Sequence, residues 1–279
     1  MSKRIIQPSD ILDFLDDGGA KKLADSKEAV EIVGADDYWL LAEEYAKSYG
    51  TFQGLSSGYK GVDDLTGSFL PGEVFVVAGS TGTGKSLFAQ NIAFNLTKKD
   101  NMVLLITLEM TKEQTLSRMI RMGENEGLRS NLLFQKASAV TDRDVGILMK
   151  KASDDLVSLV ILDHLHFLPR ATDSVRLEIS RITKHFKECA IEYKLPVMIL
   201  SHISRGVEKD EKPDLKHLKE SSSIEQDSDM VAFVHRKKET PNVMEFYMRK
   251  NRSRQLKFES IDFVQEGWRL TEIGEYDGS

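Results

Sequence analysis

The chain has 279 residues, 41% of them hydrophobic and 29% charged, with a formal net charge of −6. This composition is ordinary for a soluble globular protein, and no apolar run approaches the length of a membrane span. The single cysteine, Cys189, excludes an intramolecular disulfide and a cysteine-rich zinc site. Because residues 1–10 are polar and lack the apolar core of a signal peptide, we expect a protein of the reducing cytoplasm.

Residues 1–53 are predicted to form an extension ahead of one α/β domain that spans residues 54–279. A short helix is predicted over residues 10–17, and residues 36–49 have the pattern of an amphipathic helix. A helix tethered ahead of a compact domain packs either on its own domain or on a neighbouring subunit. The pattern leaves both arrangements open.

From about Leu55 onward the sequence alternates between strand and helix patterns. Strands are predicted at 74–78, 102–108, 156–162, 197–201, 230–235, 243–249 and 257–264, and helices at 85–96, 112–122, 142–152 and 174–193. The early strands are continuous apolar runs, which are typical of a parallel sheet covered on both faces. The late strands follow one another without helices, so the sheet is predicted to end in antiparallel hairpins.

Residues 79–86 read Gly-Ser-Thr-Gly-Thr-Gly-Lys-Ser, which is the pattern of the phosphate-binding loop of P-loop NTPases. The glycines allow backbone N–H groups to converge on phosphate oxygens, since they lack a Cβ and tolerate positive φ. Lys85 supplies a positive charge to the β- and γ-phosphates, and Ser86 places a hydroxyl on Mg²⁺. A predicted strand precedes the loop and a predicted helix follows it, as this motif requires. The predicted ATP-binding residues are Gly79, Ser80, Thr81, Gly82, Thr83, Gly84, Lys85 and Ser86.

Two predicted strands end in a carboxylate. Residues 159–163 form a buried strand pattern that ends at Asp163, a position that suits a Mg²⁺ ligand opposite Ser86. Residues 105–109 end at Glu109, which suits a base that polarises the attacking water. The alternative for Glu109 is a role in capping the helix that follows it.

Two further polar positions follow strands. His202 comes directly after the predicted strand 197–201, where a side chain can contact the γ-phosphate, although an ordinary surface histidine fits as well. Residues 249–254 form a basic run, Arg-Lys-Asn-Arg-Ser-Arg. This run fits a solvated face, a nucleic-acid contact, or an arginine finger that acts on a neighbouring active site.

Residues 204–223 are polar and are predicted to form a long loop between two strands. Loops of this length inside a compact domain are usually functional. Lys216, Lys219 and Ser222 are placed to reach nucleic-acid phosphates. A negative net charge does not exclude such contacts, because phosphate binding depends on where the positive charges lie. The alternative is a solvated insertion with no ligand.

The order of these motifs resembles the helicase domain of the hexameric replicative helicases: DnaB, the phage primase-helicases and mitochondrial Twinkle. The resemblance runs from about Ser57 to Thr271 and includes the P-loop. It also includes LITLEM at 105–110, VILDHL at 160–165, LSHISR at 200–205, DLKHLKESSSIEQDSDMVAFVHR at 214–236 and RKNR at 249–252. His202, where DnaB has Gln, is similar to the phage enzymes.

The resemblance implies a role for each motif. Glu109 is then the catalytic base, His202 the γ-phosphate sensor, and Lys250 and Arg252 the pair that reaches the ATP of the neighbouring subunit. Asp163 holds Mg²⁺ with Ser86. Phe263 falls near an aromatic position that contacts adenine. The central DNA-binding loop contains Lys216, Lys219 and Ser222, with Lys219 in place of the family's Arg and Ser222 in place of a Gly.

The resemblance also implies the fold and the activity. The fold is a RecA-like P-loop NTPase with a mostly parallel twisted sheet flanked by helices and antiparallel strands at its C-terminal end. The function is a ring-forming helicase motor that translocates on single-stranded DNA and hydrolyses ATP, or dTTP, with Mg²⁺ at subunit interfaces. The expected assembly is a homo-hexamer in the cytoplasm, that of the host if the chain is phage-encoded, with a separate primase, loader or polymerase as partner.

Two other functions remain compatible with the sequence. One is a RadA- or RecA-like recombination or branch-migration ATPase, because a Lys-Asn-Arg segment, here at 250–252, also occurs in RadA. The other is a non-motor ATP switch that clamps a partner protein.

Overall fold

The chain divides into two units, Met1–Phe52 and Gln53–Ser279. The computed structural model describes residues 54–123, 126–135, 140–163, 175–203, 211–218, 222–236 and 238–273, together with 34–36 and 39. The predicted helix at 10–17 and most of the predicted helix at 36–49 lie outside the described residues.

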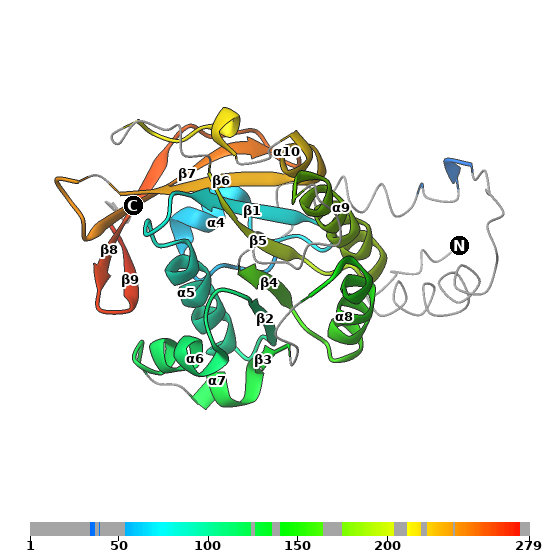
Figure 1. Cartoon of the computed structure of the whole chain (residues 1–279), viewed down its shortest axis with the longest axis horizontal. Helices are drawn as coiled ribbons and strands as arrows, with labels where there is room; N and C mark the ends of the chain where they lie inside the picture. Colours follow the sequence, from blue (N-terminus) through cyan, green and yellow to red (C-terminus); the bar gives the residue numbers. More distant parts are fainter. Residues whose placement is uncertain are drawn as a thin grey trace, which may run out of the picture. The chain divides into compact units, whose positions relative to one another are not determined.

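A nine-stranded sheet forms the centre of the second unit (Figure 1), in the order β3-β2-β4-β5-β1-β6-β7-β8-β9. The strands are β1 (Val74–Gly79), β2 (Val103–Thr107), β3 (Leu132–Phe134), β4 (Leu159–Asp163), β5 (Val197–His202), β6 (Met230–His235), β7 (Val243–Asn251), β8 (Ser260–Glu266) and β9 (Arg269–Ile273). All pairs from β3 to β6 are parallel, and the pairs from β6 to β9 are antiparallel. The predicted α/β class with a C-terminal antiparallel end is confirmed.

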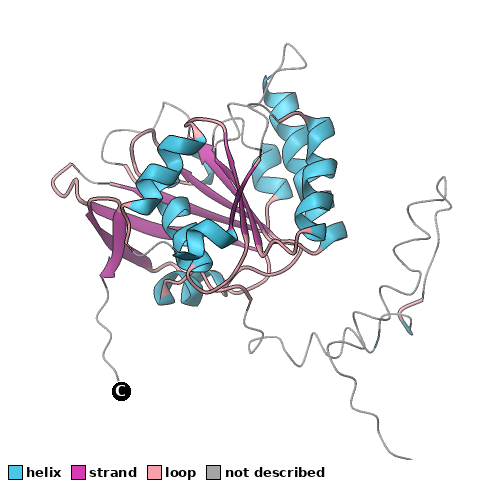
Figure 2. Ribbon diagram, turned by 90° about the horizontal axis from the view of Figure 1, so that it is seen from below, coloured by secondary structure: helices cyan, strands magenta, loops and turns pink. Residues whose placement is uncertain are grey.

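Helices cover both faces of the sheet (Figure 2). They are α4 (Lys60–Thr66), α5 (Lys85–Thr97), α6 (Lys112–Ile120), α7 (Glu126–Asn131), α8 (Asp142–Asp154), α9 (Val175–Tyr193) and α10 (Ser222–Asp227). Side chains of successive strand residues point to opposite faces, so β1 supplies two cores. Phe75 and Val77 pack with α5 on one face, and Val74, Val76 and Ala78 pack with α8 and α9 on the other. Of the described helices, none is long and apolar enough to span a membrane.

The strand predicted over 257–264 begins only at Ser260, and two further sequence predictions of local structure were wrong. The strand predicted from Leu156 begins only at Leu159, because Leu156 has φ +55° and is 83% exposed in the turn that follows α8. The stretch 204–223 is not irregular throughout. Its described part contains a 3₁₀ turn (Leu215–His217), a bridge between Ile203 and Leu218, and the start of α10.

Several short helices and strands were not predicted, because of their length. The edge strand β3 has only three residues, and α4 and α7 have seven and six. Segments of this length show little periodicity. Strand β9 follows β8 after a tight turn at Gly267, where φ is +59°.

A buried ion pair fixes the N-terminal end of β1. The carboxylate of Asp229 accepts hydrogen bonds from Lys187 Nζ at 2.6 Å and from the backbone N–H of Val74 at 2.8 Å. Lys187 also donates to the carbonyl of Gly72 at 2.8 Å. The side chain of Asp229 is 6% exposed. One carboxylate therefore joins α9, β1 and the residue that precedes β6.

We expect Asp229→Ala to lower the free energy of unfolding by about 3–5 kcal/mol, because the change leaves a mostly buried Lys187 charge and a buried N–H without their partner. Asp154→Ala is the matched control, since its pair with Lys150 is exposed on the surface of α8 and contributes about 0.5 kcal/mol or less. Urea unfolding followed by circular dichroism measures both. Equal, small losses in the two variants would show that the Asp229 pair does not stabilise the fold.

Candidate nucleotide-binding site

The loop of residues 79–86 connects the end of β1 to the start of α5. Gly84 has φ +105°, which favours glycine, and it immediately precedes the first helical residue, Lys85. A Cβ on Gly79 would lie 2.6 Å from the carbonyl oxygen of Val234. Glycine at these two positions lets the backbone form this loop, and a larger residue at either would introduce strain.

Lys85 is buried at the base of the loop, with 3% of its surface exposed. Its Nζ donates to the carbonyls of Gly79 and Ser80, both at 2.9 Å, and lies 3.3 Å from Nδ1 of His202. Burial lowers the pKa of Lys85 to about 8, and the charges of Glu109 and Asp163 oppose this shift. A bound phosphate group would stabilise the charged ammonium of Lys85 against the effect of burial. It would also replace the two carbonyls as the hydrogen-bond acceptor of Lys85 Nζ.

Ser86 and Asp163 meet across the same end of the sheet. The Ser86 hydroxyl donates to Oδ1 of Asp163 at 3.0 Å, and Asp163 is 1% exposed. Burial raises the pKa of Asp163 to about 6, and the hydrogen bond from Ser86 opposes this shift. A hydroxyl and a carboxylate are hard oxygen donors that fit Mg²⁺, which in nucleotide sites takes most of its ligands from phosphates and water.

Glu109 lies two residues beyond the end of β2, the strand that pairs with β4 and brings Thr107 opposite Asp163. Its side chain is exposed and lines the same cavity as Lys85 and Ser86. The alternative helix-capping role is wrong. Thr111 caps α6, because its hydroxyl accepts from the backbone N–H of Gln114 at 3.2 Å and the Gln114 side chain returns the bond.

A cavity of about 390 Å³ lies over the loop. It collects four of the predicted chemical positions, Lys85, Ser86, Glu109 and His202, which come from three different strand ends. This arrangement follows from the parallel strands β1, β2 and β5, whose carboxyl ends meet at one edge of the sheet.

Several cavity residues were not predicted, among them Arg236, Arg118 and Trp268. Arg236 follows β6 and donates to the carbonyl of Thr83 at 2.8 Å and to the Gln265 side chain at 2.6 Å, so it ties the loop to β8. Arg118 projects from α6, and its guanidinium lies 4.5 Å from the ring centroid of Trp268. Arg236 ends the family segment 214–236, but no motif assigned a role to it or to Arg118. Their position becomes apparent only when β6, α6 and the β8–β9 turn are placed beside β1.

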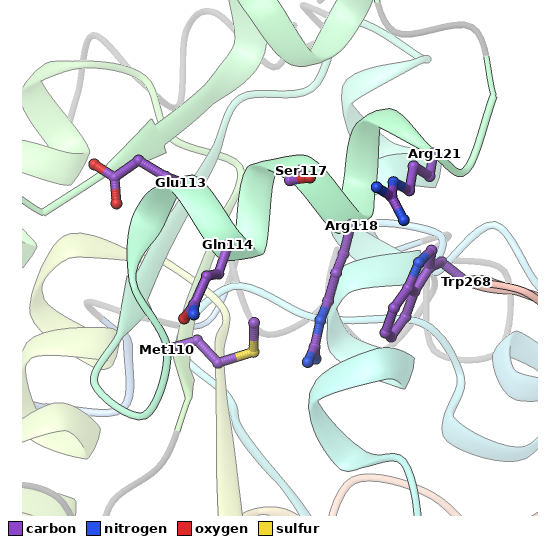
Figure 3. A pocket seen from close by; sticks show the side chains of 7 residues that line it. All are labelled: Met110, Glu113, Gln114, Ser117, Arg118, Arg121 and Trp268. Atoms are coloured by element: carbon purple, nitrogen blue, oxygen red, sulfur yellow. The ribbon is translucent and has the colours of Figure 1, made fainter.

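A second cavity, of about 460 Å³, borders the first and shares Met110, Arg118 and Trp268 with it. Figure 3 shows the Arg118 side chain alongside the indole ring of Trp268, with Arg121 above the ring in this view. The remaining lining residues are Glu113, Gln114 and Ser117, all on α6. This pocket therefore combines a flat aromatic face with two guanidinium groups.

Four other predicted site residues lie elsewhere. Phe263 is 0% exposed and packs edge-on against Tyr59 and Phe88 in the core, so it has no surface to offer adenine in this structure. Lys250 and Arg252 lie at the end of β7 and do not line the cavity over the loop of residues 79–86. Lys216 lies on the 3₁₀ turn and pairs with Glu211 at 3.3 Å.

Two predicted DNA-contact residues have no described side chain. Lys219 lies outside the described residues, and Ser222 is described only as the first residue of α10.

The strand order, the loop between β1 and α5, and the Lys85, Ser86 and Asp163 constellation define a P-loop NTPase with a RecA-like fold. The chain belongs to the family of the DnaB-like helicase C terminal domain, whose model matches residues 54–126 and 124–272. The family predicted from the motifs is confirmed.

Individual relatives agree with this assignment. The replicative DNA helicase DnaC of Bacillus subtilis (strain 168) is 30% identical over 261 residues, which cover 80% of this chain and 58% of that protein. The chain thus spans little more than half of that relative.

Two solved structures share the fold. One is an ATPase domain that superimposes with a TM-score of 0.76 at 22% identity, covering 88% of this chain and all of that one. The other is a DnaB-like replicative helicase, solved in a study of its interactions with primase, which superimposes with a TM-score of 0.74. It is 22% identical, and the match covers 95% of this chain and 71% of that one. At this identity the two structural matches establish the fold.

The different placement of Phe263 and Trp268 gives a paired test. We expect Phe263→Ala to cost about 3–5 kcal/mol of unfolding free energy, because a fully buried ring is lost from the core. Trp268→Ala should cost less stability, because the Trp268 ring is only partly buried where it packs against the core. We expect adenine to stack on the indole ring, so this change should also weaken ATP binding by about 1–3 kcal/mol, the usual contribution of a base stacked on an aromatic ring. Urea unfolding and titration with a fluorescent ATP analogue measure the two quantities. Unchanged ATP affinity in the Trp268 variant would exclude Trp268 as the base contact.

Proposed function

We propose that this chain is the motor of a ring-forming replicative DNA helicase that hydrolyses ATP between subunits and moves along single-stranded DNA. The main support for the proposal is that one chain presents two different sets of groups at opposite ends of its sheet. One end of the sheet holds the groups that bind and hydrolyse a nucleotide, and the opposite end presents two cations that cannot reach that nucleotide. Membership of the DnaB-like family supports the same assignment.

The groups at the P-loop end have distinct roles in this proposal. Lys85 and the loop N–H groups bind the β- and γ-phosphates. Ser86 and Asp163 would hold Mg²⁺, which when bound would supply positive charge to the phosphate oxygens. Glu109, exposed to the cavity, accepts the proton of the attacking water, and His202, 3.3 Å from Lys85, contacts the γ-phosphate. The same roles suit dTTP, since none of these contacts involves the base.

The strand register places Lys250 and Arg252 far from their own P-loop. Lys250 pairs with Val231, which pairs with Val76 of β1. The backbone N–H of Arg252 donates to Asp229, whose own N–H donates to Val74. Arg252 is therefore level with the start of β1, five residues from Gly79, or about 16 Å at the rise of a β-strand. A neighbouring subunit in a head-to-tail ring is the nucleotide site that these cations can serve.

The proposed DNA contacts lie on residues 211–218 and on the residues that follow. This segment is tied to β7 by the Tyr247 hydroxyl, which donates to the carbonyl of Pro213 at 2.8 Å, and by Arg249, 3.7 Å from Asp214. Lys216 extends from it with a side chain that is 69% exposed. Lys216, Lys219 and Ser222 would bind the DNA backbone, so we expect affinity to fall steeply with salt and to depend little on base sequence.

The proposal includes an assembly and partners. Trans-acting cations require a homo-oligomer, for which a closed hexamer is the family's form. A separate primase, loader or polymerase would act with it, in line with the solved relative that was studied for its interactions with primase. The proposed place of action is the cytoplasm.

The direct test is the rate of ATP hydrolysis with and without single-stranded DNA, for the wild-type chain and for Lys85→Ala. We expect DNA to stimulate the wild-type rate severalfold or more and to have no effect on the variant, which lacks the phosphate-binding charge. Mass photometry of the same samples should show a closed hexamer. Hydrolysis that does not respond to DNA would favour a non-motor switch, and a filament on DNA would favour a recombinase.

A further inference from the structure

The side chains of Lys250 and Arg252 are both docked on the C-terminal end of the short helix α10. Lys250 Nζ donates to the carbonyls of Glu225 and Ser228, the latter at 2.7 Å. The Arg252 guanidinium donates to the carbonyl of Gln226 at 3.0 Å. The last carbonyls of a helix have no partner within the helix, and they carry the negative end of its dipole. The two cations therefore cap α10.

The carboxylate of Asp229 completes this docking site. Its Oδ1 lies 3.6 Å from the Arg252 guanidinium, while its Oδ2 is held by Lys187 and Val74. The carboxylate is thus fixed to the sheet and cannot follow a moving cation. The Arg252 side chain is 54% exposed, so it can leave this position without opening the core.

The docked cations and the proposed phosphate contacts use the same donor atoms. Burial and the neighbouring charge of Arg252 lower the pKa of Lys250, so the docked position stabilises the charged ammonium less well than water does. Hydrogen bonds from a cation to phosphate oxygens are stronger than those to neutral carbonyls. A nucleotide in the neighbouring subunit can therefore compete for both side chains.

Helix α10 is placed to respond to this competition. It has six residues and packs on α9 (Figure 1), with Ile224 fully buried as its anchor. Its last turn is held by a long bond from the N–H of Ser228 to the carbonyl of Ile224 at 3.2 Å. Helices this short depend on their caps and on packing for stability. Its first residue comes four positions after Leu218, at the end of the segment to which we assign DNA contacts.

We propose that the C-terminal turn of α10 and the phosphates of the neighbouring nucleotide compete for Lys250 and Arg252, so that α10 senses whether the next subunit holds ATP. This inference rests on the proposed function, because it requires that the two cations act in trans. In the absence of nucleotide the cations cap α10. When they move to the phosphates, the last turn of α10 loses its cap and becomes more mobile.

Hydrogen–deuterium exchange of the assembled full chain tests the proposal. The readout is the exchange rate of the amides of residues 224–229, with and without a non-hydrolysable ATP analogue and Mg²⁺. We expect the analogue to increase exchange severalfold in the wild-type chain. In Lys250→Met the rate should already be high without nucleotide and should not rise further, and Arg252→Met should behave in the same way. Lys257→Met, which removes an exposed charge after β7, should match the wild type.

The amides of β6 serve as an internal control for folding, and they should exchange slowly in all variants. Two results would overturn the proposal. One is an exchange rate in α10 of the wild-type chain that does not change when the analogue binds. The other is an exchange rate in nucleotide-free Lys250→Met that equals that of the nucleotide-free wild type. If α10 does not respond but DNA still stimulates ATP hydrolysis by the wild-type chain, the proposed function stands and only the role of α10 is wrong. A chain that remains monomeric with the analogue bound contradicts both.

Discussion

The direction of β1 in the sheet decides where every other group of the site lies. Its carboxyl end leads into the phosphate-binding loop, and its amino end is fixed by the buried carboxylate of Asp229. The parallel strands β4 and β5 bring Asp163 and His202 to the first end. The antiparallel strand β7 returns the chain to the second end, so Arg252 emerges about 16 Å from the loop, by strand rise. In the proposed ring, one chain thus carries two separated halves of a nucleotide site.

Much of the first half could be predicted from sequence, because its residue types are demanded by phosphate chemistry at fixed spacing. The loop, Lys85 and Ser86 come from one contiguous motif. Asp163 and Glu109 could be predicted because Asp163 ends a buried strand and Glu109 lies just beyond another, and the carboxyl ends of parallel strands share an edge. The sheet class followed from continuous apolar strands, whereas β3 and α7 were too short to show a period.

The rest of the site depends on packing that no local pattern encodes. An aromatic residue near the end of the chain was expected to contact adenine, and Phe263 has the right type, but its alternation along β8 points it into the core. Trp268, five residues later, reaches the cavity because a tight turn at Gly267 reverses the chain. The docking of Lys250 and Arg252 on α10 uses backbone carbonyls, which every sequence contains and which therefore give no signal in the sequence.

We expect a working nucleotide site to combine the P-loop of one subunit with Lys250 and Arg252 of the next. The decisive experiment mixes two inactive variants, since Lys85→Ala keeps the cations and Arg252→Ala keeps the P-loop. At equal mixing, about a quarter of head-to-tail interfaces pair an intact P-loop with an intact Arg252, so about a quarter of the wild-type hydrolysis rate should return. A mixture as inactive as its components, or an Arg252→Ala chain that is fully active alone, would show that the site is not shared between subunits.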